Sequence, residues 1–191
     1  MPPLTLDPKT TALVLIDLQK GITSSPTVPH AADDVVSRGA ELAARCRARG
    51  ALVVLVRVDV GRHGELAPTP EADRPRPKMD FPADWADLVP ALAQAPSDVV
   101  VTKHQPNAFY ATDLEVQLAR RGIETIILGG ISTNIGVEAT ARAAHERGYE
   151  QVFVEDAMAA RDVELHTVTT AKFLPTIGRV RSTREVLAAL G

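Results

Sequence analysis

Two ionisable residues stand where a buried strand would present them to a ligand. Asp17 follows five apolar residues, ALVLI, and Lys103 ends the run DVVVTK. A carboxyl group at the mouth of a buried strand can act as an acid or a base, because desolvation and a nearby cation set its pKa. The structural alternatives are a capping or loop carboxylate for Asp17 and a lysine that extends to solvent for Lys103. Taken alone, Asp17 favours the structural alternative.

Gly136 occupies an unusual place in GGISTNIGVEATARAAHERGY, residues 129–149, which reads as a strand, a polar turn and a helix. Ser132, Thr133 and Asn134 can each cap the helix. Gly136 then falls in the first helical turn, where glycine costs about 1 kcal/mol relative to alanine. A helix start can hold an oxyanion or a carboxylate, and glycine lets such a ligand approach the backbone. The other explanation is that a neighbouring element needs the room, and the sequence leaves both open.

The elements that would position these residues alternate between strand and helix patterns. The strand runs are rich in Val, Ile and Leu rather than alternating with polar residues, which favours a parallel sheet covered on both faces. Strands are predicted at 11–16, 51–58, 98–103, 125–130 and 151–156, with a shorter one at 178–182, and helices at 33–49, 112–121, 135–147, 162–174 and 183–190. This order predicts a three-layer, doubly wound α/β fold. Ligands of such sheets bind beyond the carboxyl ends of the strands, near the point where the strand order reverses.

Residues 60–97 interrupt this alternation. The segment holds seven of the 14 prolines and the only tryptophan, Trp85. A connection of this length is usually functional or disordered. Only residues 85–93 predict a short helix, and we expect the rest to form a semi-rigid cover over one end of the sheet. Phe81, Trp85, Leu88 and Val89 offer apolar anchors, which predict a homo-oligomer interface or a covered pocket.

The composition excludes several classes of function. A chain of 191 residues that is 45% apolar and 24% charged is most simply a single globular domain over residues 1–191. The net charge of −3, with both signs interspersed, argues against nucleic-acid and anionic-membrane partners. Neither a membrane-spanning run nor a signal pattern is visible, so we expect a cytoplasmic protein. Dinucleotide, phosphate-loop and serine-hydrolase motifs are missing, so no cofactor is expected.

The cysteine and histidine residues are weaker signals. Cys46 is the single cysteine and falls on the apolar stripe of its helix, so it is expected to pack in the core. His166 lies among apolar residues, which favours a hydrogen-bonded structural role, and His104 faces either the pocket or the opposite side. Asp59 and His63 are four residues apart with no third ligand near them, so no metal site is expected.

Three stretches together resemble the isochorismatase-like hydrolase superfamily, which includes nicotinamidases and N-carbamoylsarcosine amidohydrolases. They are TALVLIDLQKGI, the run from KHQPNAFY to HERGY, and VEDAMAAR, and the resemblance covers nearly the whole chain. It implies a six-stranded parallel sheet, usually in an oligomer, with an Asp–Lys–Cys triad. Carried over by position, Asp17 is the triad aspartate and Lys103 the triad lysine, whereas the cysteine position holds Gly136. The resemblance also implies a cis peptide bond between Ile131 and Ser132.

That cis bond would turn the N–H groups of Ser132 and Gly136 towards a substrate oxygen. Catalysis is thus expected at Asp17, Lys103 and Gly136. Substrate contacts are expected from residues at the strand ends, in the turn before the helix and in the KHQPNAFY stretch: Gln19, Arg57, Phe109, Ser132, Thr133 and Asn134. The usual aspartate and histidine metal ligands of nicotinamidases are missing, so no metal is expected, and the expected partners are a small molecule and further copies of the chain.

Glycine at position 136 removes the covalent mechanism, because it cannot form a thioester, and Cys46 lies on a different helix. Two functions remain open. Isochorismatases also lack the cysteine, and Asp17 would by that resemblance protonate a vinyl ether, with Lys103 and Arg57 binding carboxylates and water adding afterwards. The turn ISTNIGVEATAR nevertheless looks more like the cysteine-bearing branch. The alternative is a non-catalytic relative that binds a small molecule or acts through its oligomer. We favour a hydrolase of unknown substrate.

Overall fold

A single six-stranded sheet organises the computed structural model, which describes residues 4–73 and 78–191. The strand order is β3-β2-β1-β4-β5-β6, and every neighbouring pair is parallel. The predicted parallel α/β fold is therefore confirmed. The strands are β1 (Thr11–Ile16), β2 (Leu52–Val58), β3 (Val99–Lys103), β4 (Thr125–Ile131), β5 (Glu150–Ala159) and β6 (Arg179–Arg181). The α-helices are α1 (Lys20–Thr23), α2 (Ala32–Ala48), α3 (Leu114–Ala119), α4 (Glu138–Glu146), α5 (Val163–Val168) and α6 (Thr183–Ala189).

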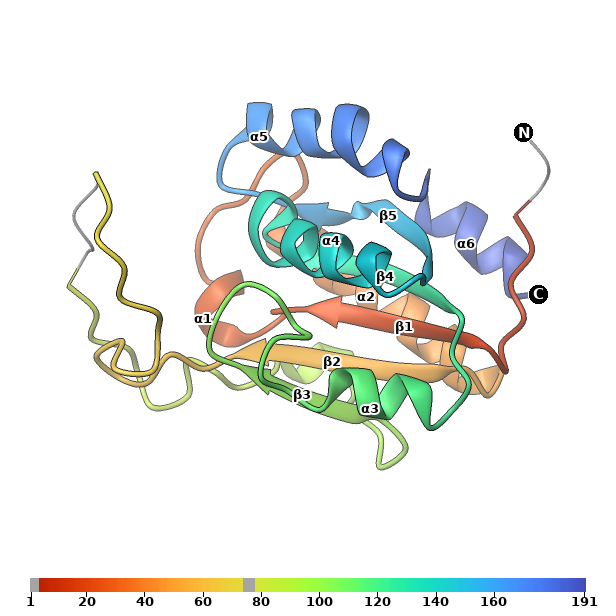
Figure 1. The fold of residues 1–191 in the computed structure, drawn as a ribbon, viewed down its shortest axis with the longest axis horizontal. Coiled ribbons are helices and arrows are strands. Elements are labelled where there is room, and N and C mark those ends of the chain that lie inside the picture. Colours follow the sequence, from red (N-terminus) through yellow and green to blue (C-terminus); the bar gives the residue numbers. More distant parts are fainter. Residues whose placement is uncertain (1–3, 74–77) are drawn as a thin grey trace.

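Two apolar cores, one on each face of the sheet, explain why the strand sequences do not alternate with polar residues. All six residues of β1 are buried. Leu13 and Leu15 pack in the core that contains α2 and α6, whereas Val14 and Ile16 pack in the core that contains α3 and α4. Figure 1 shows α3 and α4 in front of the sheet and α2 behind it. A strand covered on both faces needs apolar residues at every position.

The helix α2 follows its sequence pattern closely. Its buried stripe includes Val35, Gly39, Leu42 and Cys46. A Cβ atom on Gly39 would lie 2.9 Å from the Leu18 Cδ1 atom, so the glycine allows α2 to approach the end of β1. Cys46 is fully buried, and burial raises the pKa of its thiol to about 12. The cysteine therefore belongs to the core, as its spacing predicts.

Other helices depart from the predicted bounds. The region predicted as one helix at 135–147 is a π-helical turn, Thr133–Val137, followed by α4. The region predicted at 162–174 is likewise divided into α5 and a second π-helical turn, Thr169–Phe173. No sequence pattern predicts α1, because its support comes from a distant segment: the Gly21 N–H donates to the Trp85 carbonyl. None of the helices in the described part of the chain is long and apolar enough to cross a membrane.

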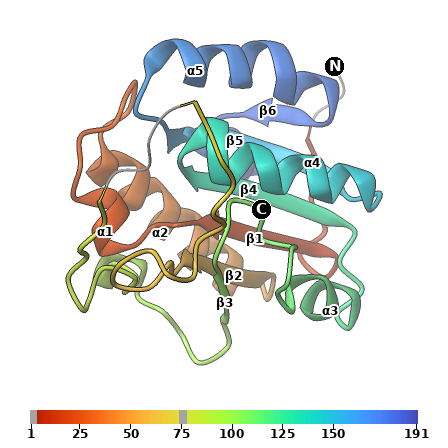
Figure 2. The ribbon, with the colours of Figure 1, turned by 60° about the vertical axis from the view of Figure 1, so that its left-hand side comes forward.

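The segment 60–97 divides into an anchored root and an outer arm, and its residues 74–77 lie outside the described part of the chain. The root, 81–92, packs against α1: the Trp85 ring stacks on Phe81 at 4.3 Å and fills the space beside Gly21. The short helix predicted at 85–93 is a turn followed by one 3₁₀ turn, Pro90–Leu92. The outer arm, residues 65–73, is mostly exposed and extends beyond the carboxyl ends of the strands (Figures 1 and 2).

Candidate active site

A cavity of about 370 Å³ opens where the strand order reverses between β1 and β4. Its volume is in the range of small-molecule pockets, and its position is the one that doubly wound sheets use for ligands. Apolar side chains form much of its wall, and three charged residues reach it. The lining residues are Asp17, Ile22, Val58, Val60, Ala67, Pro68, Lys103, His104, Gln105, Pro106, Ile131, Ser132, Ile135, Gly136 and Arg161.

Asp17 and Lys103 form a buried ion pair beside this cavity. The Lys103 Nζ atom lies 2.8 Å from Asp17 Oδ2 and donates a second hydrogen bond of 2.8 Å to the Pro106 carbonyl. Asp17 is 5% exposed and Lys103 1% exposed. The backbone of Asp17 has a φ of 55°, a left-handed conformation that aspartate tolerates better than most residues. The end of β1 and the end of β3 thus bring the two charges together.

The two carboxyl oxygens of Asp17 have different surroundings. Oδ2 accepts the hydrogen bond from Lys103, whereas Oδ1 is buried without a hydrogen-bond partner in the described part of the chain. Burial raises the pKa of Asp17 to about 6, against the opposing charge and hydrogen bond of Lys103. A carboxyl group in this state gives up and takes back a proton near neutral pH, and Oδ1 is the oxygen free to carry it.

Gly136 lies next to this ion pair. It sits in the π-helical turn before α4 and lines the cavity with Ser132, and the peptide bond between Ile131 and Ser132 is cis. A Cβ atom on Gly136 would lie 3.1 Å from Asp17 Oδ2 and 3.3 Å from Lys103 Nζ. The same atom would lie 2.9 Å from Ile16 Cγ2, which is too close without a small shift. Any side chain at position 136 would begin beside the ion pair. Both explanations of the glycine therefore apply: it gives room to Ile16, and it lies in the wall of the cavity.

Two residues expected to contact substrate do not line the cavity, because their side chains are used elsewhere. Gln19 is fully buried, and its amide bonds to the backbone of Val58 at 2.8 and 2.9 Å and to the Trp85 carbonyl at 3.2 Å. It joins β2 to the root of segment 60–97. Arg57 donates from Nε to Thr102 Oγ1 at 2.9 Å and lines a different surface hollow. The direction of Arg57 follows from its place in β2, since neighbouring residues of a strand point to opposite faces, whereas Gln19 lies beyond the end of β1.

Three further expected contacts also lie away from the cavity wall. Phe109 is in the core near Tyr149, with the Arg147 guanidinium 4.8 Å from the centre of its ring. Thr133 is fully buried and bonded through Oγ1 to His166 Nδ1 at 2.8 Å. Asn134 is half-buried and is not among the lining residues. Of the expected substrate contacts, Ser132 alone lines the cavity.

Arg161 is the charged lining residue that sequence reasoning missed. The strand predicted at 151–156 continues to Ala159, with an irregularity in its pairing between Leu128 and Gly130 of β4. Glu155 and Asp156, the last two residues of the predicted strand, therefore lie within β5, and Arg161 follows its true end. The same rule that selected Asp17 would have selected Arg161 had the length of β5 been known.

Arg161 is held beside the cavity by α1 and the loop that follows it. Its guanidinium donates to the carbonyls of Ile22 and Pro26, both at 2.8 Å. Burial lowers its pKa. His104, whose direction the sequence left open, also lines the cavity, and its Nδ1 atom bonds to the Asp59 carbonyl.

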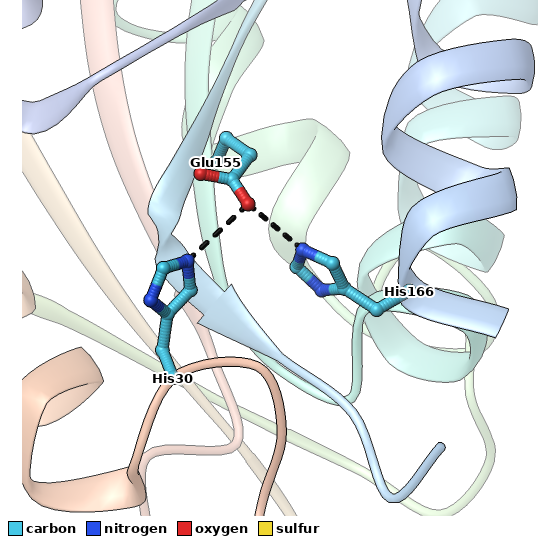
Figure 3. A group of neighbouring side chains, drawn as sticks. All are labelled: His30, Glu155 and His166. Carbon is cyan, nitrogen blue, oxygen red and sulfur yellow. Dashed lines mark hydrogen bonds and ion pairs between the residues drawn. The ribbon is translucent and has the colours of Figure 1, made fainter. Parts of the chain in front are cut away.

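A second group of ionisable side chains gathers away from the cavity, from three separate elements. His30, Glu155 and His166 meet with their ligand atoms within 4.8 Å of one another (Figure 3). His166 is buried and hydrogen-bonded, as its surroundings in the sequence predict. Asp59 and His63 do not join this group.

The protein has a parallel sheet with a ligand cavity at the point where the strand order reverses. An aspartate paired with a lysine lines that cavity, and this combination is typical of a class of α/β hydrolases. The isochorismatase domain matches residues 11–185. The chain therefore belongs to the isochorismatase family of hydrolases.

Individual relatives agree with this assignment. The chain is 49% identical over 187 residues to the uncharacterized isochorismatase family protein YecD of Escherichia coli O157:H7, covering 98% of this chain and 100% of that protein. It is 30% identical to the ureidoacrylate amidohydrolase RutB of Methylobacterium radiotolerans, over 99% of this chain and 83% of that protein. The solved structure of an isochorismatase family protein from Burkholderia thailandensis superposes with a TM-score of 0.93 at 45% identity, covering 99% of each chain.

Proposed function

We propose that the protein hydrolyses a small, partly apolar substrate, with Asp17 as the proton donor and without an enzyme thiol. The observation that carries this proposal is the asymmetry of the Asp17 carboxyl group. One oxygen is held by Lys103, while the other is buried beside the cavity with no partner among the described residues. A pKa of about 6 keeps the proton available near neutral pH.

The reaction needs no covalent intermediate, which suits a site with glycine at position 136. For a vinyl ether, Asp17 would transfer its proton to the alkene carbon and leave an oxocarbenium ion. Water would then add, return a proton to Asp17, and the resulting hemiketal would break into an alcohol and a carbonyl compound. Lys103 would stabilise the Asp17 carboxylate after the transfer, because the two are already hydrogen-bonded.

The cavity wall indicates what kind of substrate would fit. Ile22, Val58 and Val60 offer apolar surface, and the Arg161 guanidinium offers hydrogen-bond donors for an anionic group. Arg161 therefore takes the place that the sequence had assigned to Arg57. The relative named as a ureidoacrylate amidohydrolase supports the inclusion of ureido compounds among the candidates.

The decisive experiment is a hydrolysis screen with isochorismate, ureidoacrylate, carbamoyl compounds and simple amides, run before and after treatment with iodoacetamide. We expect turnover of an anionic substrate that survives thiol alkylation and falls at least 100-fold in Asp17→Asn, since general acid catalysis contributes about 10²–10⁴-fold. A Cys46→Ala variant serves as the control for alkylation. Loss of turnover on alkylation, or full activity in Asp17→Asn, would refute the mechanism. Ligand-dependent thermal shifts without any turnover would identify a binding protein instead.

A further inference from the structure

Two histidines converge on one oxygen of a glutamate at the edge of the molecule where α5 meets the loop before α2. His30 Nε2 lies 3.2 Å and His166 Nε2 lies 2.9 Å from Glu155 Oε1. Figure 3 shows the two imidazole rings approaching the carboxyl group from different elements. The rings are 6.0 Å apart between centroids and nearly perpendicular, at 80°. All three residues present a metal-ligating atom to the same small volume.

The surrounding structure holds two of these side chains in place. His166 is 2% exposed, and Thr133 Oγ1 is bonded to its other ring nitrogen, Nδ1, at 2.8 Å. A hydrogen bond to the second ring nitrogen is the usual way in which proteins orient a histidine ligand. The loop that carries His30 is fixed to the end of β5 by a pair of 2.8 Å backbone hydrogen bonds between Val28 and Ala160.

The distances and charges suit a divalent cation. Zinc bonds of about 2.0–2.1 Å in a tetrahedral site separate neighbouring ligand atoms by roughly 3.3 Å. The two nitrogen-to-oxygen distances of 3.2 and 2.9 Å are close to that value, and all three ligand atoms lie within 4.8 Å of one another, so a modest rearrangement of the side chains would admit the ion. Glu155 supplies a carboxylate oxygen, whose charge attracts a cation, and the two imidazoles supply nitrogen donors.

We propose that His30, Glu155 and His166 bind a zinc ion, or a late first-row divalent metal of similar preference, at a site separate from the candidate active site. None of the three residues lines the cavity. Two imidazole nitrogens and a carboxylate oxygen form a donor set that zinc and its neighbours accept and that magnesium does not favour. Binding requires the lone pair of His166 Nε2, so its proton moves to Nδ1, which then donates to Thr133 Oγ1.

The ion would stabilise the structure and would take no part in the reaction. It would add a tie between the loop before α2, β5 and α5, beside the existing backbone hydrogen bonds between Val28 and Ala160. Thr133, which holds His166, directly follows Ser132 of the cavity wall. Zinc binding would therefore also steady the turn that carries Gly136. This departs from the sequence-based expectation of no metal site, because 125 and 11 residues separate the ligands from Glu155 along the chain.

The test is titration of the chelator-treated full-length protein with zinc chloride, by calorimetry and by thermal unfolding. We expect one zinc ion per chain and a rise in Tm that magnesium chloride does not produce. His30→Gln and Glu155→Gln should each weaken zinc binding at least tenfold, while His145→Gln, which changes an exposed histidine outside the group, should bind as the unmodified protein does.

Both test variants change partly exposed side chains, 24% and 38% exposed, so the fold should tolerate them, and circular dichroism checks this. The cobalt(II) spectrum of the unmodified protein gives a second measurement that needs no variant, since nitrogen and oxygen ligands around cobalt produce visible bands that zinc abolishes. Absence of zinc binding and of these bands, or unchanged binding in both glutamine variants, would overturn the proposal.

Discussion

Lys103 reaches Asp17 across an intervening strand. The lysine ends β3, the aspartate follows β1, and β2 lies between them, yet Nζ and Oδ2 are 2.8 Å apart. The ion pair exists only once the sheet is assembled in this order. Its members are 86 residues apart in the chain, so the pair can form only when the whole site is folded.

Removing one charge of the ion pair should destabilise the protein more than removing both charges. Asp17→Asn leaves a buried ammonium group without a counter-charge, and we expect a loss of about 3–5 kcal/mol in the free energy of unfolding. The double variant Asp17→Asn/Lys103→Met removes both charges and should recover most of that loss while remaining inactive. Urea unfolding of the wild type, both single variants and the double variant measures the coupling. A double variant less stable than Asp17→Asn would contradict this account.

Activity should follow the protonation state of Asp17. A proton donor works only in its neutral form, so kcat/KM should be level below about pH 6 and fall tenfold for each pH unit well above it. The measurement is a pH–rate profile on the best substrate from the screen. A profile that rises through pH 6 would instead make the Asp17 carboxylate a general base.

A cysteine at position 136 would test whether the rest of the triad apparatus is intact. Gly136→Cys must displace the Ile16 Cγ2 atom slightly, and we expect a loss of about 1–3 kcal/mol in stability. Its thiol would lie beside Asp17 and Lys103, so it should react with iodoacetamide far faster than buried Cys46 and should give amidase activity. Gly136→Ala is the matched control, since it adds the Cβ without the thiol. Equal alkylation rates in Gly136→Cys and in the wild type would refute the predicted geometry.

Arg161 should select substrates by charge. Arg161→Met removes the guanidinium beside the cavity, and we expect KM for an anionic substrate to rise about tenfold, equivalent to about 1.4 kcal/mol, with little change for a neutral analogue. Because Arg161 also holds the carbonyls of Ile22 and Pro26, the neutral analogue separates a binding effect from a loosened loop. Arg120→Gln, at an exposed helix end, is the control. Equal effects on both substrates would assign Arg161 a structural role only.

The outer arm, residues 65–73, should pack against a second copy of the chain. Leu66 is 48% exposed on an arm that extends beyond the carboxyl ends of the strands, so its side chain is available to contact a neighbouring chain. We expect light scattering to report a homo-oligomer at micromolar concentration and Leu66→Asp to shift it towards the monomer. A wild-type monomer under these conditions would exclude the interface.

The sheet and the ion pair were predictable because their signals are local. Apolar runs such as 11–16 gave strand positions to within a few residues, and the rule that polar residues follow strand ends selected Asp17 and Lys103 together. Parallel strands then place such residues at one edge of the sheet. The resemblance to a known superfamily added the significance of Gly136, which spacing alone left open.

The parts that the sequence did not place depend on side-chain direction or on contacts between distant segments. Gln19 and Arg57 stand near strand ends, but their side chains bond to the backbone of Val58 and to Thr102, which no local pattern reveals. Arg161 was missed because β5 runs past an irregular pairing that its sequence does not mark. His30 and Glu155 are joined only when the loop before α2 meets β5, so their meeting with His166 had no signal in the spacing.

The outer arm of segment 60–97 is a site where the chain could be cut without separating the elements that hold the fold together. Exposed loop tips are preferred sites of proteolytic cleavage, and residues 70–73 are all exposed. A single cut there would leave β2 paired with β3, and Gln19 still bonded to the Trp85 carbonyl. Limited digestion should therefore yield a nicked but folded protein. The active site would then be shared by two interlocking peptides, one carrying Asp17 and the other carrying Lys103 and Gly136.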